Sequence, residues 1–133
     1  MTRNCTAQDM MSEVEVRVDV HTTLLEAMQR MHSKKCTYAL VTGVNGDDPC
    51  LITMTDMVQV MHQKGELGDW LNEETVESYM TPNLLTVKST DLCRDIMNMF
   101  VASRVHQIVV LDEQEPVGMI TLLDLTTWFF GSL

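Results

Sequence analysis

A short corner motif occurs twice in the sequence, and this duplication constrains the fold more than any other feature. Residues 51–56 (Leu-Ile-Thr-Met-Thr-Asp) are matched by residues 118–124 (Gly-Met-Ile-Thr-Leu-Leu-Asp), with Thr53 and Thr121 standing 68 positions apart. In both stretches an apolar run gives way to Thr-x-x-Asp and then to a helical pattern. Each stretch therefore predicts a strand that runs directly into a helix.

The elements before each corner also repeat, at an offset of 69 residues. Residues 14–18 alternate valine with charged residues, which predicts a strand, and Thr23-x-x-Glu26 predicts a capping box at the start of an amphipathic helix. The apolar stripe of that helix recurs in the second copy: Leu24, Ala27, Met28 and Met31 correspond to Cys93, Ile96, Met97 and Phe100. Met11-Ser12 and Met80-Thr81 stand at matching positions of the two copies, ahead of the first strand of each.

The same patterns predict the remaining elements. Residues 37–42 and 105–111 are each the second strand of a copy, and the chain then turns at residues 43–49 and 112–116. The helix after Thr53 is expected to carry Met57, Val58 and Met61 on one face and to end at Gly65. The last helix is expected to cover residues 122–130.

Each copy thus has the order strand-helix-strand-strand-helix, and its sheet has an apolar face that one copy cannot cover alone. We predict an α+β fold, an α/β sandwich of two repeats packed face to face about a pseudo-two-fold axis. The repeats are assigned to residues 1–64 and 76–133. The acidic, glycine-containing residues 65–75 are assigned as a linker anchored by Trp70 and Leu71.

Charge and composition restrict the partners. The net charge of −10 at pH 7 argues against nucleic acid and anionic membranes as partners, because both are negatively charged. No apolar run reaches the roughly 20 residues of a membrane span and the N-terminus lacks a signal-peptide core, so a cytoplasmic protein is expected. The twelve methionines fill core gaps or line an adaptable binding face. The four cysteines form no Cys-x-x-Cys motif, so we expect reduced, mostly buried thiols and no metal site: Cys5, Cys36, Cys50 and Cys93.

Two interpretations of the corners remain open from the residues alone. A Ser/Thr-x-x-acid box caps a helix, and an aspartate in the first turn suits the helix dipole, so each corner can be a structural cap worth about 1 kcal/mol. Alternatively, a carboxylate with two acceptor oxygens can bind both vicinal hydroxyls of a ribose, while threonine and the first-turn N–H groups bind phosphate. Two such corners at equivalent places favour the ligand interpretation.

The second copy carries motifs that resemble those of the paired CBS-domain, or Bateman, module. They are Val76-x-x-x-Met80-Thr81-Pro82, Asn98-Met99-Phe100, residues 105–112 (Val-His-Gln-Ile-Val-Val-Leu-Asp) and Gly118-Met119-Ile120-Thr121-x-x-Asp124. Within this family the chain looks most like the gamma subunit of AMP-activated protein kinase, because of the Val-His at the second strand and the Leu-Ile-Thr-x-Thr-Asp corner. The resemblance covers about residues 7 to 130.

The resemblance implies a nucleotide-sensing module in which each site combines the corner of one copy with the first two strands of the other. Site A would consist of Leu51, Thr53, Thr55, Asp56, Leu84, Leu85, Val105 and His106. Site B, the poorer match, would consist of Val16, Cys36, Thr37, Met119, Thr121 and Asp124. In site A, Asp56 is expected to hold ribose, the threonines and His106 to meet phosphate, and the leucines and Val105 to enclose adenine.

Departures from the family pattern narrow the expected ligand. In site B, Thr37 occupies the histidine position and Leu123 replaces a threonine. Gln107 stands where the kinase subunit has a second basic residue, which lowers the charge available to a polyphosphate. We therefore expect AMP or ADP ahead of ATP, with S-adenosylmethionine as a further adenosine ligand. Cys50 replaces the glycine seen as Gly118, which affects close backbone approach.

The sequence predicts a non-catalytic regulatory module that binds adenine nucleotides and needs no cofactor. It shows no nucleophile-base pair, metal cluster or Gly-rich phosphate loop. The alternative is a structural dimerisation or partner-docking module with empty nucleotide clefts, which the acidic surface and the Trp128-Phe129-Phe130 end also fit. Under either hypothesis the resemblance implies a homodimer, and a regulated protein partner is expected.

Overall fold

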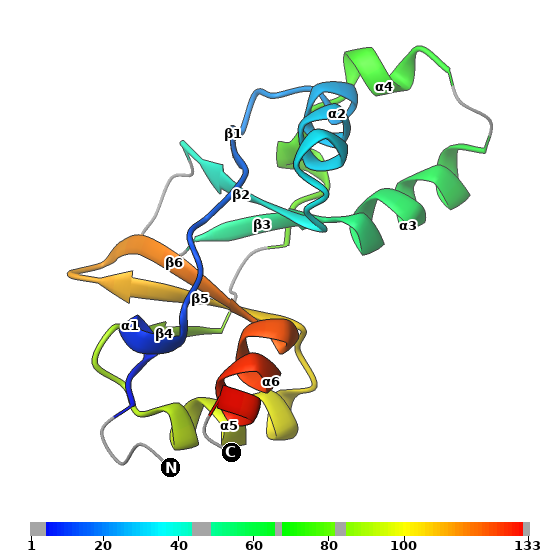
Figure 1. Ribbon diagram of the computed structural model, residues 1–133. Coiled ribbons are helices and arrows are strands. Elements are labelled where there is room, and N and C mark those ends of the chain that lie inside the picture. Colours follow the sequence, from blue (N-terminus) through cyan, green and yellow to red (C-terminus); the bar gives the residue numbers. More distant parts are fainter. Residues whose placement is uncertain (1–4, 44–48, 66–67, 82–84, 132–133) are drawn as a thin grey trace. The chain divides into compact units, whose positions relative to one another are not determined.

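The computed structural model describes residues 5–43, 49–65, 68–81 and 85–131. These residues fall into two compact units. The first, called the middle unit, is Val14–Leu84, and the second, called the terminal unit, joins Met1–Glu13 to Leu85–Leu133. Each unit holds one three-stranded sheet (Figure 1).

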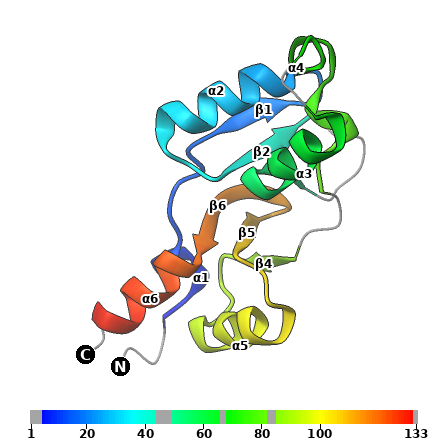
Figure 2. The same cartoon turned by 90° about the vertical axis from the view of Figure 1, so that its right-hand side faces the viewer.

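The middle unit has the predicted order of strand, helix, strand, strand and helix. Its elements are β1 (Arg17–Asp19), α2 (Leu24–Lys34), β2 (Tyr38–Thr42), β3 (Cys50–Thr53), α3 (Met54–Lys64), α4 (Trp70–Glu73) and the 3₁₀ helix η1 (Val76–Ser78). Strand β1 pairs in parallel with β2, which pairs antiparallel with β3. Helix α2 packs against β2 and α3 (Figure 2).

The terminal unit repeats this topology. Its elements are α1 (Ala7–Met10), β4 (Thr86–Lys88), α5 (Cys93–Ser103), β5 (Gln107–Asp112), β6 (Glu115–Thr121) and α6 (Leu122–Gly131). Strand β4 pairs in parallel with β5, which pairs antiparallel with β6. The two matching sheets with their helices confirm the predicted duplicated α+β fold.

The boundaries of the two structural units differ from those of the two copies in the sequence. The segment that carries Ser12 belongs to the terminal unit, and the segment that carries Thr81 belongs to the middle unit. Isolated antiparallel bridges join Ser12 to Met119 and Thr81 to Leu51. Each sheet is therefore extended by a segment that precedes the first strand of the other copy. The repeat boundaries assigned from the sequence stay a prediction.

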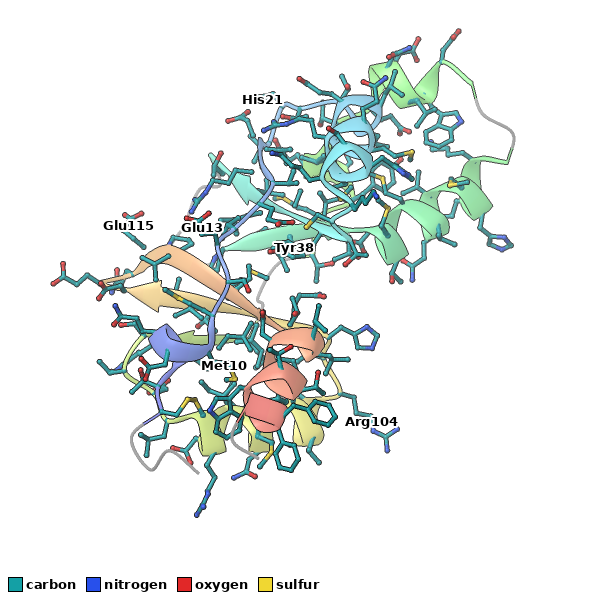
Figure 3. All side chains as sticks on the ribbon, in the orientation of Figure 1. Met10, Glu13, His21, Tyr38, Arg104 and Glu115 are labelled. Atoms are coloured by element: carbon teal, nitrogen blue, oxygen red, sulfur yellow. A yellow bond between two sulfur atoms is a disulfide. The ribbon has the colours of Figure 1, made fainter. Side chains whose placement is uncertain are left out.

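The core of the terminal unit lies between one face of its sheet and the helices α1, α5 and α6. Alternate residues of a strand point to the same face, which brings Ile108 and Val110 of β5 together with Ile120 of β6. Met10 of α1, labelled in Figure 3, is buried in the same cluster, and Trp128 of α6 packs against it. Helix α5 adds Cys93, Ile96 and Phe100.

The predicted start of α2 is confirmed in part and its apolar stripe largely: the Thr23 half of the expected capping box is present, and no bond from the Thr23 N–H to the Glu26 side chain is found. The Thr23 hydroxyl accepts a hydrogen bond from the Glu26 N–H at 3.2 Å, so Thr23 is the N-cap. The buried residues of α2 are Leu24, Ala27 and Met31, three of the four stripe positions. Among the described residues, no helix is both long enough and apolar enough to cross a membrane.

The predicted face of α3 is wrong. Met57 and Val60 are each 2% exposed, whereas Val58 and Met61 are 62% and 42% exposed. The helix carries two apolar stripes about 100° apart, and only one of them can face the interior. Residues 57 and 60, three positions apart, form the stripe that is buried. The predicted end of the helix is confirmed, because Gly65 is its C-cap.

Two connections are more ordered than predicted. The expected linker contains α4, and its end is tied to the start of α2, because the Leu24 N–H donates to the Glu74 carbonyl at 3.0 Å. The β5–β6 turn consists of Glu113 and Gln114, whose φ values of 50° and 69° are typical of a two-residue hairpin. The other predicted turn falls mostly on residues 44–48, outside the described residues.

Two cysteines are paired, so the prediction of reduced thiols is wrong for them. Cys5 and Cys93 form a disulfide, with Cα atoms 5.5 Å apart, while Cys36 and Cys50 are buried thiols. The sequence separation of 88 between Cys5 and Cys93 hides this pair from any spacing motif, because the bond forms only when the segment before β1 packs on α5.

Candidate functional site

The corner of the middle unit lies where β3 ends and α3 begins. The Asp56 N–H donates to the Thr53 hydroxyl at 3.2 Å. In return, Asp56 Oδ2 accepts from the Thr53 N–H at 2.8 Å and from the Thr53 hydroxyl at 3.0 Å. These bonds form a complete capping box, because the strand ends in extended backbone and the first-turn N–H groups have no helical partners.

The corner of the terminal unit repeats this geometry between β6 and α6. The Asp124 N–H donates to the Thr121 hydroxyl at 3.2 Å, and Asp124 Oδ2 accepts from the Thr121 N–H and hydroxyl at 2.8 and 3.0 Å. Both corners are therefore helix caps. Each cap uses the carboxylate oxygen Oδ2. The other oxygen, Oδ1, therefore decides whether a corner can also bind a ligand.

A second hydroxyl, which is the third hydrogen-bond donor in all, reaches each carboxylate, and the sequence prediction did not include it. Ser12 Oγ donates to Asp124 Oδ1 at 2.5 Å. Thr81 Oγ1 lies 3.4 Å from both oxygens of Asp56. The signal that could have found these residues is their equivalent position in the two copies, just before the first strand of each.

Backbone pairing fixes both hydroxyls in place. The Ser12 N–H donates to the Met119 carbonyl at 2.8 Å, and the Met119 N–H donates back at 2.9 Å. Thr81 and Leu51 exchange the same two bonds, at 2.7 and 3.3 Å. Leu51 and Met119, both predicted site residues, thus use their backbone groups for this pairing, and both side chains are buried.

Gly118 allows the close approach of the segment that carries Ser12. A Cβ at this position would lie 2.9 Å from Met11 Cγ and 3.1 Å from the Ser12 carbonyl oxygen. The glycine therefore leaves room for the Met11 side chain and the Ser12 backbone inside the terminal unit. Cys50 carries a side chain at the equivalent position of the middle unit, which agrees with the longer contact of Thr81 there.

The predicted residues of site A fall in both units. The middle unit brings Leu51, Thr53, Thr55 and Asp56 together at its corner, with Thr55 exposed. The terminal unit holds the other described members: Leu85 and His106 are exposed, and Val105 packs against the core. Leu84 lies outside the described residues.

The predicted residues of site B are divided in the same way. Val16, Cys36 and Thr37 belong to the middle unit, where Val16 and Cys36 are buried and Thr37 is exposed. Met119, Thr121 and Asp124 belong to the terminal unit, where Met119 is buried and the two polar residues are partly buried.

Within each unit, the backbone brings the corner next to a residue predicted for the other site. The Leu122 N–H at the start of α6 donates to the His106 carbonyl at 3.3 Å. The Met54 N–H at the start of α3 donates to the Thr37 carbonyl at 2.9 Å. These contacts arise because the second strand of each sheet begins beside the end of the third.

A charged cluster anchors the segment that leads to Thr81. Glu74 Oε1 accepts from the Tyr79 hydroxyl at 2.7 Å and forms an ion pair with Lys64 Nζ at 3.1 Å. The Tyr79 hydrogen bond and then Lys64 lower the pKa of Glu74. Its bond to Glu74 in turn raises the pKa of Lys64, and the same carboxylate raises the pKa of Tyr79.

The corners offer hydrogen bonding and dipole interactions to a ligand. The Oδ1 atoms can accept from ligand hydroxyls, and the first-turn N–H groups of α3 and α6 carry the partial positive charge that favours phosphate. In the part of the chain that the structure describes, no group of three or more His, Cys, Asp or Glu side chains could hold a metal ion.

The sequence matches one protein family. The family model described as CBS domain matches residues 7–63 and again residues 76–131. A comparison with curated protein sequences finds no match.

Solved structures share the fold at low sequence identity. CBSX2 in complex with AMP is 18% identical, with a TM-score of 0.80 over 96% of this chain and 98% of that one. The CBS domain pair of protein MJ0100, in complex with 5′-methylthioadenosine and S-adenosyl-L-methionine, is 19% identical, with a TM-score of 0.79 over 96% and 98%. Protein MJ1004 from Mathanocaldococcus jannaschii is 20% identical, with a TM-score of 0.79 over 95% of this chain but 60% of that one.

The present chain therefore spans less than two thirds of the length of MJ1004 and nearly all of the other two. Each of the two family matches includes its own strand-to-helix corner. From this duplicated topology and the two family matches we conclude that the chain belongs to the CBS-domain family.

Proposed function

We propose that this chain is a non-catalytic regulatory module that binds adenosine-containing ligands, AMP and ADP ahead of ATP. The observation that carries the proposal is the duplicated corner, in which the cap uses Oδ2 of an aspartate and leaves Oδ1 to a hydroxyl donor. CBSX2 with AMP and the MJ0100 domain pair with S-adenosyl-L-methionine support an adenosine ligand, so S-adenosylmethionine is the second candidate.

Asp56 is the main ribose ligand in this proposal. Its Oδ1 is held by a 3.4 Å contact from Thr81, whereas Oδ1 of Asp124 is held by a 2.5 Å bond from Ser12. Short O–H···O⁻ bonds of about 2.5–2.7 Å are the stronger ones. A ribose hydroxyl therefore displaces Thr81 from Asp56 more readily than it displaces Ser12 from Asp124.

Phosphate is assigned to the hydroxyl groups at the corner and to His106. Thr53 and Thr55 stand at the positive end of α3, and His106 is exposed. With a net charge of −10, the chain attracts a polyphosphate poorly, which supports AMP and ADP over ATP. We also propose that the remaining residues of sites A and B contact the ligand. The proposal includes the likeness to the kinase gamma subunit.

The test is calorimetric titration with AMP, ADP, ATP and S-adenosylmethionine. Asp56→Asn should weaken AMP binding at least about tenfold, or roughly 1.4 kcal/mol, and Asp124→Asn should weaken it less. Asp9→Asn is the matched control, because Asp9 closes the capping box of α1 by accepting from the Thr6 N–H and hydroxyl at 3.0 and 3.1 Å. An absence of heat at millimolar ligand, or equal losses in Asp56→Asn and Asp9→Asn, would contradict the proposal.

Exposed apolar side chains on α6 favour a second role, in dimerisation or partner docking. Leu123, Phe129 and Phe130 are 74%, 51% and 70% exposed, and the two phenylalanine rings meet edge to face with centroids 6.3 Å apart. We propose that this face pairs with a second copy of the chain, or with a regulated protein. Light scattering on the wild type and on Phe130→Ser tests the homodimer, which predicts a lower mass for the variant.

The cytoplasm is the proposed location of this module. Cys36 and Cys50 are buried thiols, whereas Cys5 and Cys93 form a disulfide, a bond that is uncommon in a reducing compartment. The proposed location therefore rests on the sequence prediction. Fractionation of cells with an antibody against the chain tests the location, and recovery outside the cytoplasmic fraction would contradict it.

A further inference from the structure

A disulfide fastens the segment that carries Ser12 to the helix α5. Cys5 is bonded to Cys93, the first residue of α5, and the Cys93 N–H also donates to the Cys5 carbonyl at 3.0 Å. Both cysteines are buried. The described stretch from Cys5 to Ser12 is called the clamp segment below.

The clamp segment has little stability of its own. Its helix α1 is four residues long, too short to be stable without contacts. The Ala7 and Gln8 N–H groups donate to the carbonyls of Asp91 and Ser89 at 2.8 and 3.0 Å, and the side chains of Ala7 and Met10 are buried. The disulfide at one end and the pairing of Ser12 with Met119 at the other complete the anchoring.

We propose that the clamp segment controls, in a redox-dependent way, whether Asp124 Oδ1 at the Thr121/Asp124 corner is available to a ligand. In the oxidised chain the disulfide holds the segment so that Ser12 Oγ stays on Asp124 Oδ1. In the reduced chain the segment opens more often, and Oδ1 becomes available to another donor. A protein disulfide in a reducing compartment is usually transient and redox-sensing, which fits this role in the cytoplasm proposed above.

The redox step is thiol–disulfide exchange with a cellular thiol or dithiol. A thiolate of the reductant attacks one sulfur of the Cys5–Cys93 bond and forms a mixed disulfide, and the other cysteine leaves as a thiolate. A second reductant thiolate then attacks the reductant's sulfur in the mixed disulfide, which forms the reductant's own disulfide and expels the second protein cysteine as a thiolate. Two electrons and two protons end on Cys5 and Cys93. Because both sulfurs are buried, the attack requires a local opening of the clamp segment.

The middle unit supplies an internal reference. Its segment before Thr81 is held by a bridge between Thr75 and Thr23 and by the Val76 N–H, which donates to the Thr22 carbonyl at 2.9 Å. The disulfide lies wholly in the terminal unit. Reduction should therefore leave the contacts between Thr81 and Leu51 unchanged.

Hydrogen–deuterium exchange of the whole chain, followed by mass spectrometry, tests the proposal without any nucleotide. Oxidised glutathione and dithiothreitol set the two states, and the intact mass and thiol labelling verify them. We expect reduction to accelerate exchange about tenfold or more at residues 7–12 and at Met119, because those amides exchange by local opening. Exchange at Leu51 and Thr81 should not change.

Variants separate the clamp from a general loss of stability. Cys5→Ser should show the fast exchange of the reduced wild type in both buffers, and Cys50→Ala, which removes a buried thiol of the middle unit, should keep the redox response. The reduced wild type gives the answer even if Cys5→Ser does not fold. Three results would overturn the proposal: unchanged exchange with both thiols verified as reduced, equal acceleration at Leu51 and Thr81, or no Cys5–Cys93 bond under oxidised glutathione.

Discussion

The two corners have the same cap, but the segments that complete them are held in different ways. At the terminal corner, Ser12 comes from a segment fixed by a disulfide and donates to Asp124 at 2.5 Å. At the middle corner, Thr81 follows a segment fixed by the Lys64–Glu74–Tyr79 cluster and lies 3.4 Å from Asp56.

A duplicated fold can therefore keep its local chemistry while its long-range supports diverge. The Thr-x-x-Asp boxes are local, since all their bonds join residues three apart. The supports join residues far apart in sequence, since Ser12 and Asp124 have a sequence separation of 112. One support responds to redox conditions and the other to pH, so they can be broken separately.

Removal of the disulfide should lower the stability of the protein more than any other single change. Cys93→Ala should lower the free energy of unfolding of the oxidised protein by about 2–4 kcal/mol, because the cross-link restricts the unfolded chain. Urea denaturation with and without reductant measures this loss. Reductant should destabilise the wild type and leave Cys93→Ala unchanged. A wild type that is equally stable in both buffers would show that the terminal segment needs no covalent support.

Gly118→Ala tests the close approach that distinguishes the terminal corner. The new Cβ would press on Met11 and on the Ser12 carbonyl, and such overpacking costs about 1–3 kcal/mol. Gly131→Ala is the control, because a Cβ there would meet nothing within 4 Å. Met11→Ala in the Gly118→Ala background should restore part of the loss. Equal stabilities of the two glycine variants in thermal unfolding would contradict this explanation.

The hydrogen bond from Ser12 to Asp124 should be stronger than the contact from Thr81 to Asp56. A hydrogen bond to a charged group contributes about 1.5–3 kcal/mol when it is well formed, and less when it is long or exposed. Ser12→Ala should therefore lower stability by about 1 kcal/mol, and Thr81→Ala by about half of that. Paired urea denaturation curves check the order. A larger loss in Thr81→Ala would reverse the comparison of the corners.

Local patterns made most of the fold and both caps predictable from the sequence. The strands, helices and Thr-x-x-Asp corners depend on periods and spacings of a few residues, and the second copy verified the first. The buried face of α3 was not predictable from the pattern, because the stripe of Met57 and Val60 and that of Val58 and Met61 are both apolar. Only packing distinguishes the two.

The contacts of Ser12 and Thr81 with the two aspartates could not be derived from sequence spacing, and neither could the disulfide. Both depend on which segment extends which sheet, and the segments before β1 and β4 each pair with the sheet of the other copy. The matching positions of Ser12 and Thr81 can be seen in the sequence. Their contacts with the aspartates form only because each segment crosses to the sheet of the other copy. The cysteine pair is likewise a consequence of the crossing of the first segment.

The smallest expected effect is the pH dependence of the middle-unit support. The pKa of Glu74 lies below its usual value of 4.5, so the carboxylate contributes stability above pH 4.5 and loses it as the pH falls through the lowered pKa. The pKa values of Tyr79 and Lys64 lie above their usual 10.0 and 10.5, so their contribution is complete below pH 10.0 and is lost as the pH rises through the raised values.

Tyr79→Phe isolates this effect, because it removes the largest cause of the Glu74 shift. The melting temperature of the wild type should exceed that of the variant at neutral pH, and the difference should shrink below pH 4.5 and above pH 10.0. The difference should be small, because the side chains are partly exposed and solvent screens them. A difference that stays constant with pH would mean that Tyr79 acts by packing alone. The ratio of the exchange rates in the variant and the wild type should follow the same profile at Thr81. At Ser12 this ratio should stay constant with pH, because the disulfide that holds the Ser12 segment does not titrate.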